Sequence, residues 1–256
     1  MEFRSLIHSS TPLPPNPLYP PFPSEVPVLP DIQTILVPKG AEYQAVCRGV
    51  RGVLNPPTVF PVPVGSVPLS QYLQQLHQAG CLFEQQRILV MGLCGGLTPA
   101  LTVGDAVLYQ NCVMSHDLSM SALFCDLILT EEIQAMLGSC VKLVKAVTSD
   151  RVISRTAEKH QLAQQFSAEV VDMEGFAALA TLTQIGVNVA TLRVVSDDYQ
   201  HDIPNLAHAF DENGSLRPMA LAIAMMREPM AALHLISGST KSLKILQNLT
   251  SKLFDS

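Results

Sequence analysis

The stretch VVDMEGFAALATLTQIGVNVATLRVVSDD, residues 170–198, joins a helical pattern to a strand pattern. Asp172-Met173-Glu174 precedes an apolar run that predicts an amphipathic helix ending at Gly186. An apolar strand follows and ends on Ser196-Asp197-Asp198. Carboxylates therefore occur at the start of the helix and at the carboxyl end of the strand. Because open α/β sheets bind ligands beyond the carboxyl ends of their strands, these acids predict a site in one crevice.

Composition excludes several classes of protein. The 256-residue chain is 48% hydrophobic and 15% charged, which suits one large α/β domain with a buried core. The net charge is −6 and no basic stripe occurs, so a nucleic-acid partner is not expected. No secretory signal and no transmembrane segment are recognisable. The six cysteines form no CxxC pair and the seven histidines no metal-binding pattern, which predicts a cytoplasmic protein without a metal.

The chain is expected to form a proline-rich arm over residues 1–30, free or strapped across the surface, and one domain over residues 31–256. The arm holds nine of the nineteen prolines. In the domain, strands alternate with helices, which predicts a three-layer α/β/α sandwich around a central mixed, mostly parallel sheet. The expected strands are 32–37, 87–93, 106–113, 141–148 and 187–195, with edge strands within 53–68. The expected helices are 41–50, 70–79, 131–137, 156–166, 217–227 and 238–253.

The acidic turn in the opening stretch has a structural and a functional interpretation. Asp172 is a good N-cap, and the helix dipole favours an acid in the first helical turn. Glu174 can instead project beyond the end of the helix. Its carboxylate would then accept hydrogen bonds from two sugar hydroxyls. The residues alone leave both interpretations open.

The polar residues of the following strand also have two interpretations. Asp197 either forms a turn with Ser196 and Asp198 or acts as a general acid. A carboxyl group held among apolar neighbours and beside a second acid keeps its proton near neutral pH. Strand alternation places Arg193 on the same face as Asp197, and an arginine within an apolar strand needs a partner. Glu42, in the first predicted helix, is a candidate partner unless it faces solvent.

A glycine-rich loop, Gly92-Leu93-Cys94-Gly95-Gly96, follows a second apolar strand. Glycines allow the backbone to approach a ligand and to present N–H groups to an anion or a sugar oxygen. The loop has neither GxGxxG nor Walker spacing, and a tight strand exit explains it equally well.

Three motifs in this order resemble the nucleoside phosphorylase and nucleosidase superfamily, and its 5′-methylthioadenosine/S-adenosylhomocysteine nucleosidases in particular. They are GLCGGLTPALTVGD (92–105), VVDMEG (170–175) and LRVVSDD (192–198), and the resemblance covers about residues 32–200. It implies a sheet flanked by helices and an enzyme that breaks the N-glycosidic bond of a purine nucleoside.

The resemblance also implies roles for the matching residues. Asp197 corresponds to the acid that protonates the purine, Glu174 to the carboxylate that binds ribose hydroxyls, and Met173 to the residue beneath the sugar. Glu42 lies where the nucleosidases have the glutamate that activates water. Arg193 lies where they have an arginine near the nucleophile. Further substrate contacts are expected from Asp172, Val152, Leu93, Cys94, Gly95 and Ser196.

Three positions depart from the family pattern. Leu93 replaces a hydroxyl side chain near the nucleophile, and Val152 replaces an aromatic that stacks on the base in the nucleosidases. Phosphorylases often carry an arginine shortly before the glycine-rich loop, where this chain has Val90. Phosphate as a co-substrate would therefore have to be held by backbone N–H groups, Arg193, Arg48 or Arg51.

The C-terminal part resembles the tail of the hopanoid-associated phosphorylases, beginning with HDIPNLAHAFDENGSLRP (201–218). Those proteins are thought to remove adenine from an adenosyl-lipid, so two apolar helices would line a channel for a lipid tail. Ordinary packing or a dimer interface explains the same residues. A homo-oligomer is expected, because a neighbour's loop often completes such sites, and His116-Asp117 lies in a stretch suited to this. The apolar residues are Met219, Met225, Met226, Met230, Leu233, Leu235 and Ile236.

Together these features predict cleavage of a purine nucleoside by phosphorolysis, with adenine as the expected base. Hydrolysis, with Glu42 activating water, is the alternative. A protein that binds a nucleoside without cleaving it is a second alternative. The charges that develop during cleavage would be stabilised as in glycoside hydrolysis, and the reaction is expected to need no metal or organic cofactor. The expected partners are a small-molecule nucleoside, with or without a lipid tail, and further copies of the chain.

Overall fold

The computed structural model describes residues 31–116, 121–211 and 213–254. The predicted arm at residues 1–30 lies outside them. The strands are β1 (Thr34–Pro38), β2 (Thr58–Val62), β3 (Arg87–Gly96), β4 (Ala106–Met114), β5 (Leu123–Phe124), β6 (Val141–Thr148), β7 (Val170–Asp172) and β8 (Asn188–Asp197). The helices are α1 (Ala41–Gly49), α2 (Ser66–Gln78), α3 (Leu127–Leu137), α4 (Thr156–Phe166), α5 (Gly175–Ile185), α6 (Pro218–Arg227) and α7 (Pro229–Phe254), with a 3₁₀ turn, η1, at Gly138–Cys140.

The strands form one mixed sheet in which parallel pairs predominate, as predicted. Its order is β2-β1-β3-β7-β6-β4-β5, and β8 pairs with both β3 and β4. The antiparallel pairs are β3–β7, β4–β5 and β4–β8. Because β7 joins β3 to β6 while β8 joins β3 to β4, the five strands β3, β8, β4, β6 and β7 close into a ring. The sequence pattern did not predict this closure.

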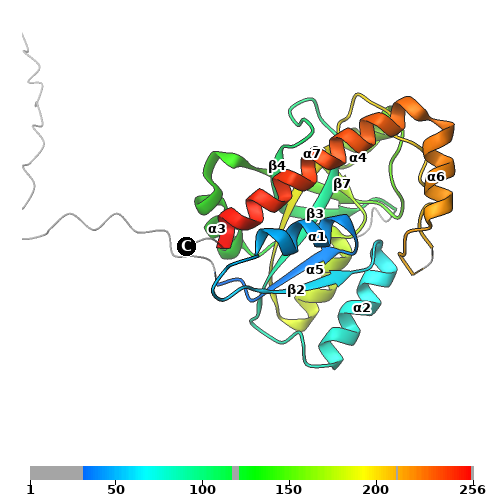
Figure 1. The fold of residues 1–256 in the computed structure, drawn as a ribbon. Coiled ribbons are helices and arrows are strands. Elements are labelled where there is room, and N and C mark those ends of the chain that lie inside the picture. Colours follow the sequence, from blue (N-terminus) through cyan, green and yellow to red (C-terminus); the bar gives the residue numbers. More distant parts are fainter. Residues whose placement is uncertain (1–30, 117–120, 212, 255–256) are drawn as a thin grey trace, which may run out of the picture.

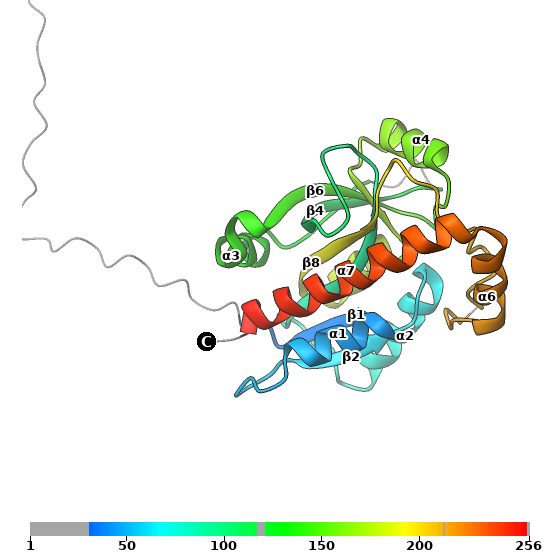
Figure 2. The same ribbon diagram turned by 45° about the horizontal axis from the view of Figure 1, so that its top comes forward.

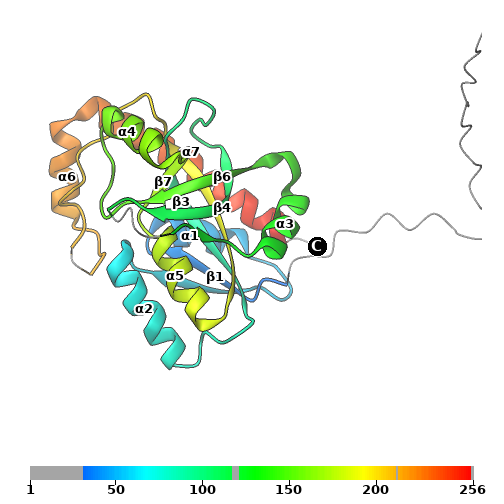
Figure 3. The ribbon, with the colours of Figure 1, turned by 180° about the vertical axis from the view of Figure 1, so that it is seen from behind.

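Helices cover both faces of the sheet, which confirms the predicted three layers. The long helix α7 crosses in front of the sheet beside α1 (Figure 1). Figure 2 shows the same pair from another angle, with α6 beyond the N-terminal end of α7. The view from behind shows α5 and α2 on the opposite face (Figure 3).

Each face of the sheet has its own apolar core. On one face, Leu69 and Leu73 of α2 pack with Leu182 of α5. On the other, Val46 of α1 packs with Leu246 of α7. Fully burying one such side chain contributes about 1.5–3 kcal/mol, so these cores dominate the stability of the sandwich. Strand β8 is buried along nearly its whole length, since helices cover both of its faces.

Helix α7 also holds the carboxyl end of β8 in place. A Cβ atom on Gly238 would lie 2.2 Å from the carbonyl oxygen of Ser196, so only glycine allows this approach. One turn further, Ser242 Oγ donates a hydrogen bond to the Val195 carbonyl oxygen at 2.6 Å. The backbone that carries Asp197 is therefore supported from behind by the C-terminal helix.

Several predicted bounds differ from the observed ones. Helix α7 begins at Pro229 rather than Gly238, and α2 begins at Ser66 rather than Ser70. Pro68 lies in the first turn of α2, where a helix does not need the missing N–H group. A single strand, β2, occupies the region predicted to hold edge strands, and it does lie at the edge of the sheet.

Two further observations, on the cysteines and on the helices, bear on the cellular compartment of the protein. All six cysteines lie within the described residues and are free thiols. Among the helices of the described residues, none is both long and apolar enough to cross a membrane. The compartment of the protein stays a prediction.

Candidate active site

Most of the predicted site residues meet in a cavity of about 170 Å³ at the carboxyl ends of β1, β3, β7 and β8. Arg193 does not line this cavity, since its side chain is fully buried beneath it among the carboxylates described below. The roles predicted for these residues remain predictions, but the structure brings them together. The lining includes Glu42, Leu93, Cys94, Gly95, Val152, Asp172, Met173, Glu174, Ser196 and Asp197.

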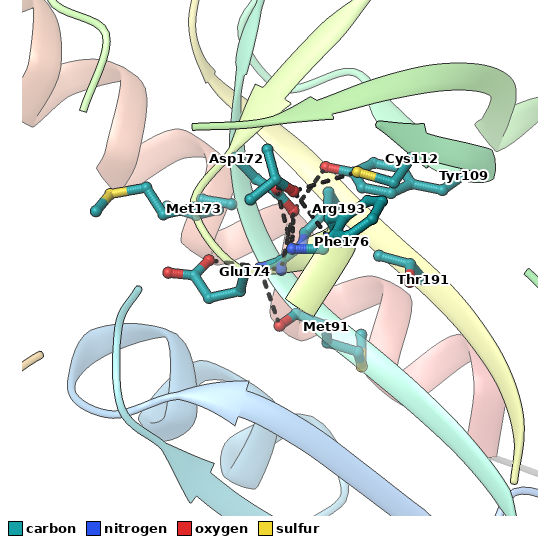
Figure 4. A network of polar contacts seen from close by, with 12 residues as sticks. Met91, Tyr109, Cys112, Asp172, Met173, Glu174, Phe176, Thr191 and Arg193 are labelled. Atoms are coloured by element: carbon teal, nitrogen blue, oxygen red, sulfur yellow. Dashed lines mark hydrogen bonds and ion pairs between the residues drawn. The ribbon is translucent and has the colours of Figure 1, made fainter. Parts of the chain in front are cut away.

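The Asp172 carboxylate lies at the centre of a buried polar network (Figure 4). Its Oδ1 accepts a hydrogen bond from Thr148 Oγ1 at 2.7 Å, and its Oδ2 accepts one from the Tyr109 hydroxyl at 3.2 Å. Both oxygens also lie within 3.1 Å of the Gly175 backbone N–H. The N-cap position of α5 is Glu174, so Asp172 stabilises the start of the helix from two residues further out than predicted. These contacts make Asp172 a support for the acidic turn.

Arg193 is a fully buried cation whose partners differ from the one predicted. Its Nη2 lies 3.2 Å from Asp172 Oδ2 and 3.6 Å from Glu174 Oε2, and its Nη1 donates to the Met91 carbonyl oxygen at 3.5 Å. Glu42, the predicted partner, forms no ion pair with it. Burial alone would lower the pKa of Arg193, but the neighbouring carboxylates raise it above its usual range, so the guanidinium stays charged.

Glu174 combines burial with a position on the cavity wall. Its Oε1 accepts a hydrogen bond from the Gly65 N–H at 3.0 Å, which ties the acidic turn to the start of α2. Ser66 Oγ strengthens this contact by donating to the Met173 carbonyl oxygen at 3.1 Å. Burial raises the pKa of Glu174 to about 7, although Arg193 opposes the rise. A carboxyl group of this kind exchanges its proton near neutral pH.

Glu42 faces the cavity from α1, opposite the acidic turn. Its Oε2 accepts a hydrogen bond from the backbone N–H of Leu93 at 2.9 Å. The segment 92–96 was expected to be a loop after the strand, but it is the end of β3 and pairs with β8, so the strand itself holds Glu42 in place. Burial raises the pKa of Glu42, while Arg193 and this hydrogen bond lower it. A Cβ atom on Gly92 would lie 2.3 Å from Arg193 Nη1 and 2.6 Å from Glu42 Oε2. Glycine at this position lets the cation and the acid approach the strand backbone.

Asp197 has a neighbour that the sequence interpretation did not include. We expected apolar residues and a second acid around it, but the buried Lys159 of α4 donates to its Oδ2 and to the Asp198 carbonyl oxygen. Asp197 Oδ1 accepts a hydrogen bond from Ser196 Oγ at 2.8 Å. Gly95 leaves room in front of the carboxylate, since a Cβ atom there would lie 3.0 Å from Oδ2. Asp197 therefore faces the cavity as one half of an ion pair.

Sequence reasoning missed several residues of the site. Lys159 was placed in the predicted helix 156–166 without a role in the site. The sequence signal for its burial was its position three residues before the buried Leu162, which puts both side chains on the same helical face. Gly65 and Ser66 lie outside the predicted helix 70–79. Arg151 lines the cavity beside Val152, and its guanidinium pairs with Glu158. No local pattern marked Gly65 and Ser66, because their roles arise from contacts with the distant acidic turn.

Other predicted residues lie outside the cavity. Arg48 Nε donates to Gln247 Oε1 of α7 at 3.0 Å, and Arg51 is exposed and does not line the cavity. His116 is exposed and lines a neighbouring hollow that shares Val152 and Met173 with the cavity, while Asp117 lies outside the described residues. The apolar residues of α6 and α7 do not line the cavity, and both the lipid tail and the oligomer stay predictions. The exposed members of that set are Met219, Met226, Met230, Leu233 and Ile236.

The fold and the arrangement of acids define a class of protein. The sequence profile of the phosphorylase superfamily matches residues 21–227. The chain therefore belongs to the phosphorylase superfamily, which confirms the family inferred from the three motifs and, at that level, the predicted enzyme class. No curated protein sequence matches the chain significantly.

Solved structures show which members of the class the fold resembles. The 5′-methylthioadenosine/S-adenosylhomocysteine nucleosidase of Helicobacter pylori is 16% identical, with a TM-score of 0.66 over 88% of this chain and 99% of that one. Futalosine hydrolase of the same organism is 16% identical, with a TM-score of 0.66 over 87% and 96%. A putative nucleosidase of the first kind from Borrelia burgdorferi, bound to adenine, is 12% identical, with a TM-score of 0.65 over 87% and 98%. At these identities the similarity shows a shared fold.

Proposed function

We propose that this protein hydrolyses the N-glycosidic bond of a purine nucleoside, with adenine as the leaving base. The observation that carries the proposal is that three of the four carboxyl groups lining one cavity come from different segments, while the fourth, Asp172, supports the acidic turn. Glu42 comes from α1, Glu174 from the start of α5 and Asp197 from the end of β8. Three acids with separate supports can act on the nucleophile, the sugar and the base of one substrate.

Each acid has a distinct task in this reaction. Cleavage gives the sugar the character of an oxocarbenium ion, and the base leaves with the electron pair of the broken C–N bond. Glu174 accepts hydrogen bonds from ribose hydroxyls and stabilises the positive charge. Asp197 passes a proton to the base, which then leaves as a neutral molecule. Glu42 takes a proton from the attacking water, which its raised pKa favours.

The charges around the cavity support water rather than phosphate as the acceptor. The sequence favoured phosphorolysis, but Arg151 is the one cationic side chain among the described residues that line the cavity, and Glu158 already pairs with it. Arg193 is buried and pairs with two carboxylates. Phosphate carries up to two negative charges near neutral pH, so the acids would repel it. A neutral water molecule beside Glu42 meets no such repulsion.

The relatives support the same chemistry and the same base. Two of the solved structures are named as a nucleosidase and a hydrolase, and a third contains adenine. We carry the purine over to this chain on that ground, together with the position of Asp197. The substituent at the 5′ position of the sugar is a separate question, which substrates of different length can answer.

The test is release of adenine from 5′-methylthioadenosine and adenosine, with and without inorganic phosphate. We expect free sugar as the product and a rate that phosphate does not change. Ribose-1-phosphate as the product would instead establish phosphorolysis. Asp197→Asn should bind the nucleoside but release base about 10²–10⁴-fold more slowly, since that is the usual contribution of a general acid. Nucleoside binding without any release by the unmodified protein would establish a binding protein and refute the proposal.

A further inference from the structure

Lys159 is a fully buried cation that the proposed reaction does not yet use. It lies on α4, and its ammonium group donates to Asp197 Oδ2 and to the Asp198 carbonyl oxygen. Helix α4 turns an otherwise apolar side toward the sheet, where Leu162 is also buried. An apolar side chain of similar volume would pack there without the desolvation that a buried ammonium group requires. The position of Lys159 therefore needs an explanation beyond packing.

The pair formed by Lys159 and Asp197 is largely sealed from solvent. The lysine side chain is 0% exposed and the aspartate side chain 12% exposed, on the cavity side. Asp197 therefore lies between the buried ammonium group of Lys159 and the cavity in which the leaving base would bind. The other titratable groups near the pair come from each neighbouring element. They are Asp198 and His201 after β8, His234 and Lys241 on α7, His160 on α4 against Tyr199, Cys94 on β3, Arg151 with Glu158, and Glu42, Asp172 and Glu174 around the cavity.

We propose that Lys159 is a positioning residue that supplies, through Asp197, the proton taken up by the leaving base. The proposal rests on the hydrolysis proposed above. Asp197 forms an ion pair with Lys159 in this structure, and an ionised aspartate has no proton to give. The proton that the leaving base needs is carried instead by the ammonium group of Lys159, the other member of the pair.

The transfer balances within the pair and the substrate. As the C–N bond breaks, its electron pair moves to the base, and a ring nitrogen of the base accepts a proton from the Asp197 carboxyl group. At the same time an N–H bond of Lys159 breaks and its proton moves to the Asp197 carboxylate. Lys159 becomes neutral, Asp197 ends as it began, and Glu42 gains the proton of the attacking water. Solvent restores both residues after the products leave.

The proposal predicts a change in pH dependence that a structural role would not produce. Without the lysine, Asp197 must carry the proton itself, and a carboxyl group loses its proton at much lower pH than an ammonium group. We expect the kcat/KM of Lys159→Met to come nearest to that of the unmodified protein at pH 5 and to fall further behind as the pH rises. At pH 8 the loss should reach about 10²-fold, within the usual contribution of a general acid. Comparing variant with unmodified protein at each pH cancels the titration of Glu42 and Glu174.

Two further variants make the test independent of folding. Lys159→Gln keeps hydrogen-bond donors for Asp197 and Asp198 but no proton to release, so it should show the same displaced alkaline limb. Lys142→Met removes a surface lysine that pairs with Asp105 at 2.8 Å, away from the cavity, and should leave the profile unchanged. Thermal unfolding monitored by circular dichroism shows that each variant is folded at the pH of the assay.

The outcomes separate this proposal from the one on which it depends. A loss of activity that is uniform from pH 5 to 8 in both Lys159 variants, with the alkaline limb unmoved, overturns the proton supply and leaves hydrolysis intact. Activity of Lys159→Gln equal to that of the unmodified protein at pH 8 also overturns it. If the unmodified protein releases no base from either nucleoside, both proposals fail together.

Discussion

Replacing Glu174 with glutamine separates the stability of the fold from the proposed activity. Burial raises the pKa of Glu174 from 4.5 to about 7, so the folded protein holds this proton more tightly than the unfolded chain does. The stabilisation from the bound proton is complete below about pH 4.5 and is lost as the pH rises to about 7. A rise of this size corresponds to about 3 kcal/mol, because one pKa unit is worth about 1.4 kcal/mol.

Glutamine has nearly the same shape as glutamate and carries no charge to desolvate. Its side-chain carbonyl oxygen can accept the hydrogen bond that the Gly65 N–H donates to Glu174 at 3.0 Å in the unmodified protein. Arg193 loses its contact at 3.6 Å but keeps Asp172 at 3.2 Å. We therefore expect Glu174→Gln to match the unmodified protein at pH 4.5 and to exceed its stability by up to about 3 kcal/mol at pH 8. Each kcal/mol should raise Tm by roughly 2–4 °C.

The assay is urea unfolding at intervals from pH 4.5 to 8, with adenine release measured on the same samples. Glu158→Gln is the control, since it removes a partly exposed carboxylate that pairs with Arg151, and such pairs contribute about 0–1 kcal/mol. Parallel stability curves for Glu174→Gln and the unmodified protein would refute the buried, proton-holding state of Glu174. A variant that is more stable and equally active would refute its role on the ribose.

Three further substitutions test other parts of the structure. Arg193→Met should destabilise the fold by about 3–5 kcal/mol in urea unfolding, because it leaves Asp172 buried without its cation; an unchanged midpoint would contradict the ion pair. Gly238→Ala should cost about 1–3 kcal/mol and lower kcat, because its Cβ would lie 2.2 Å from the Ser196 carbonyl oxygen and push α7 away from β8. Glu42→Gln should lower kcat about 10²–10⁴-fold with little change in nucleoside affinity; equal turnover would exclude it as the base for water.

The sequence predicted those helices and strands whose residue pattern alone indicates their type and position in the fold. The apolar run of β8 indicated a central strand, and the prolines within residues 53–68, of which Pro61 lies in β2, indicated an edge strand, without any tertiary information. The last helix was expected to begin at Gly238, yet this glycine lies inside α7. Its reason is the close approach to Ser196, a contact between segments about forty residues apart that no local pattern encodes.

The sequence predicted those site residues that lie within recognisable motifs. Glu174 and Asp197 lie in motifs and line the cavity as expected. Glu42 was a candidate partner for Arg193, but the observed partners belong to the acidic turn, since β7 and β8 both lie beside β3. Lys159 was missed because a lysine on a helix is usually solvated, and only the packing of α4 shows that this one is buried.

The ring of strands has a consequence for how copies of this chain can associate. Closure leaves β2 and β5 as the ends of the described sheet. Strand β5 has two residues, and β2 contains Pro61, which lacks the N–H group that a neighbouring strand would require. Edge-to-edge pairing between molecules, the route to amyloid-like assembly, is therefore blocked at both ends of this sheet. Any association through the described residues would then use surfaces other than the two ends of this sheet.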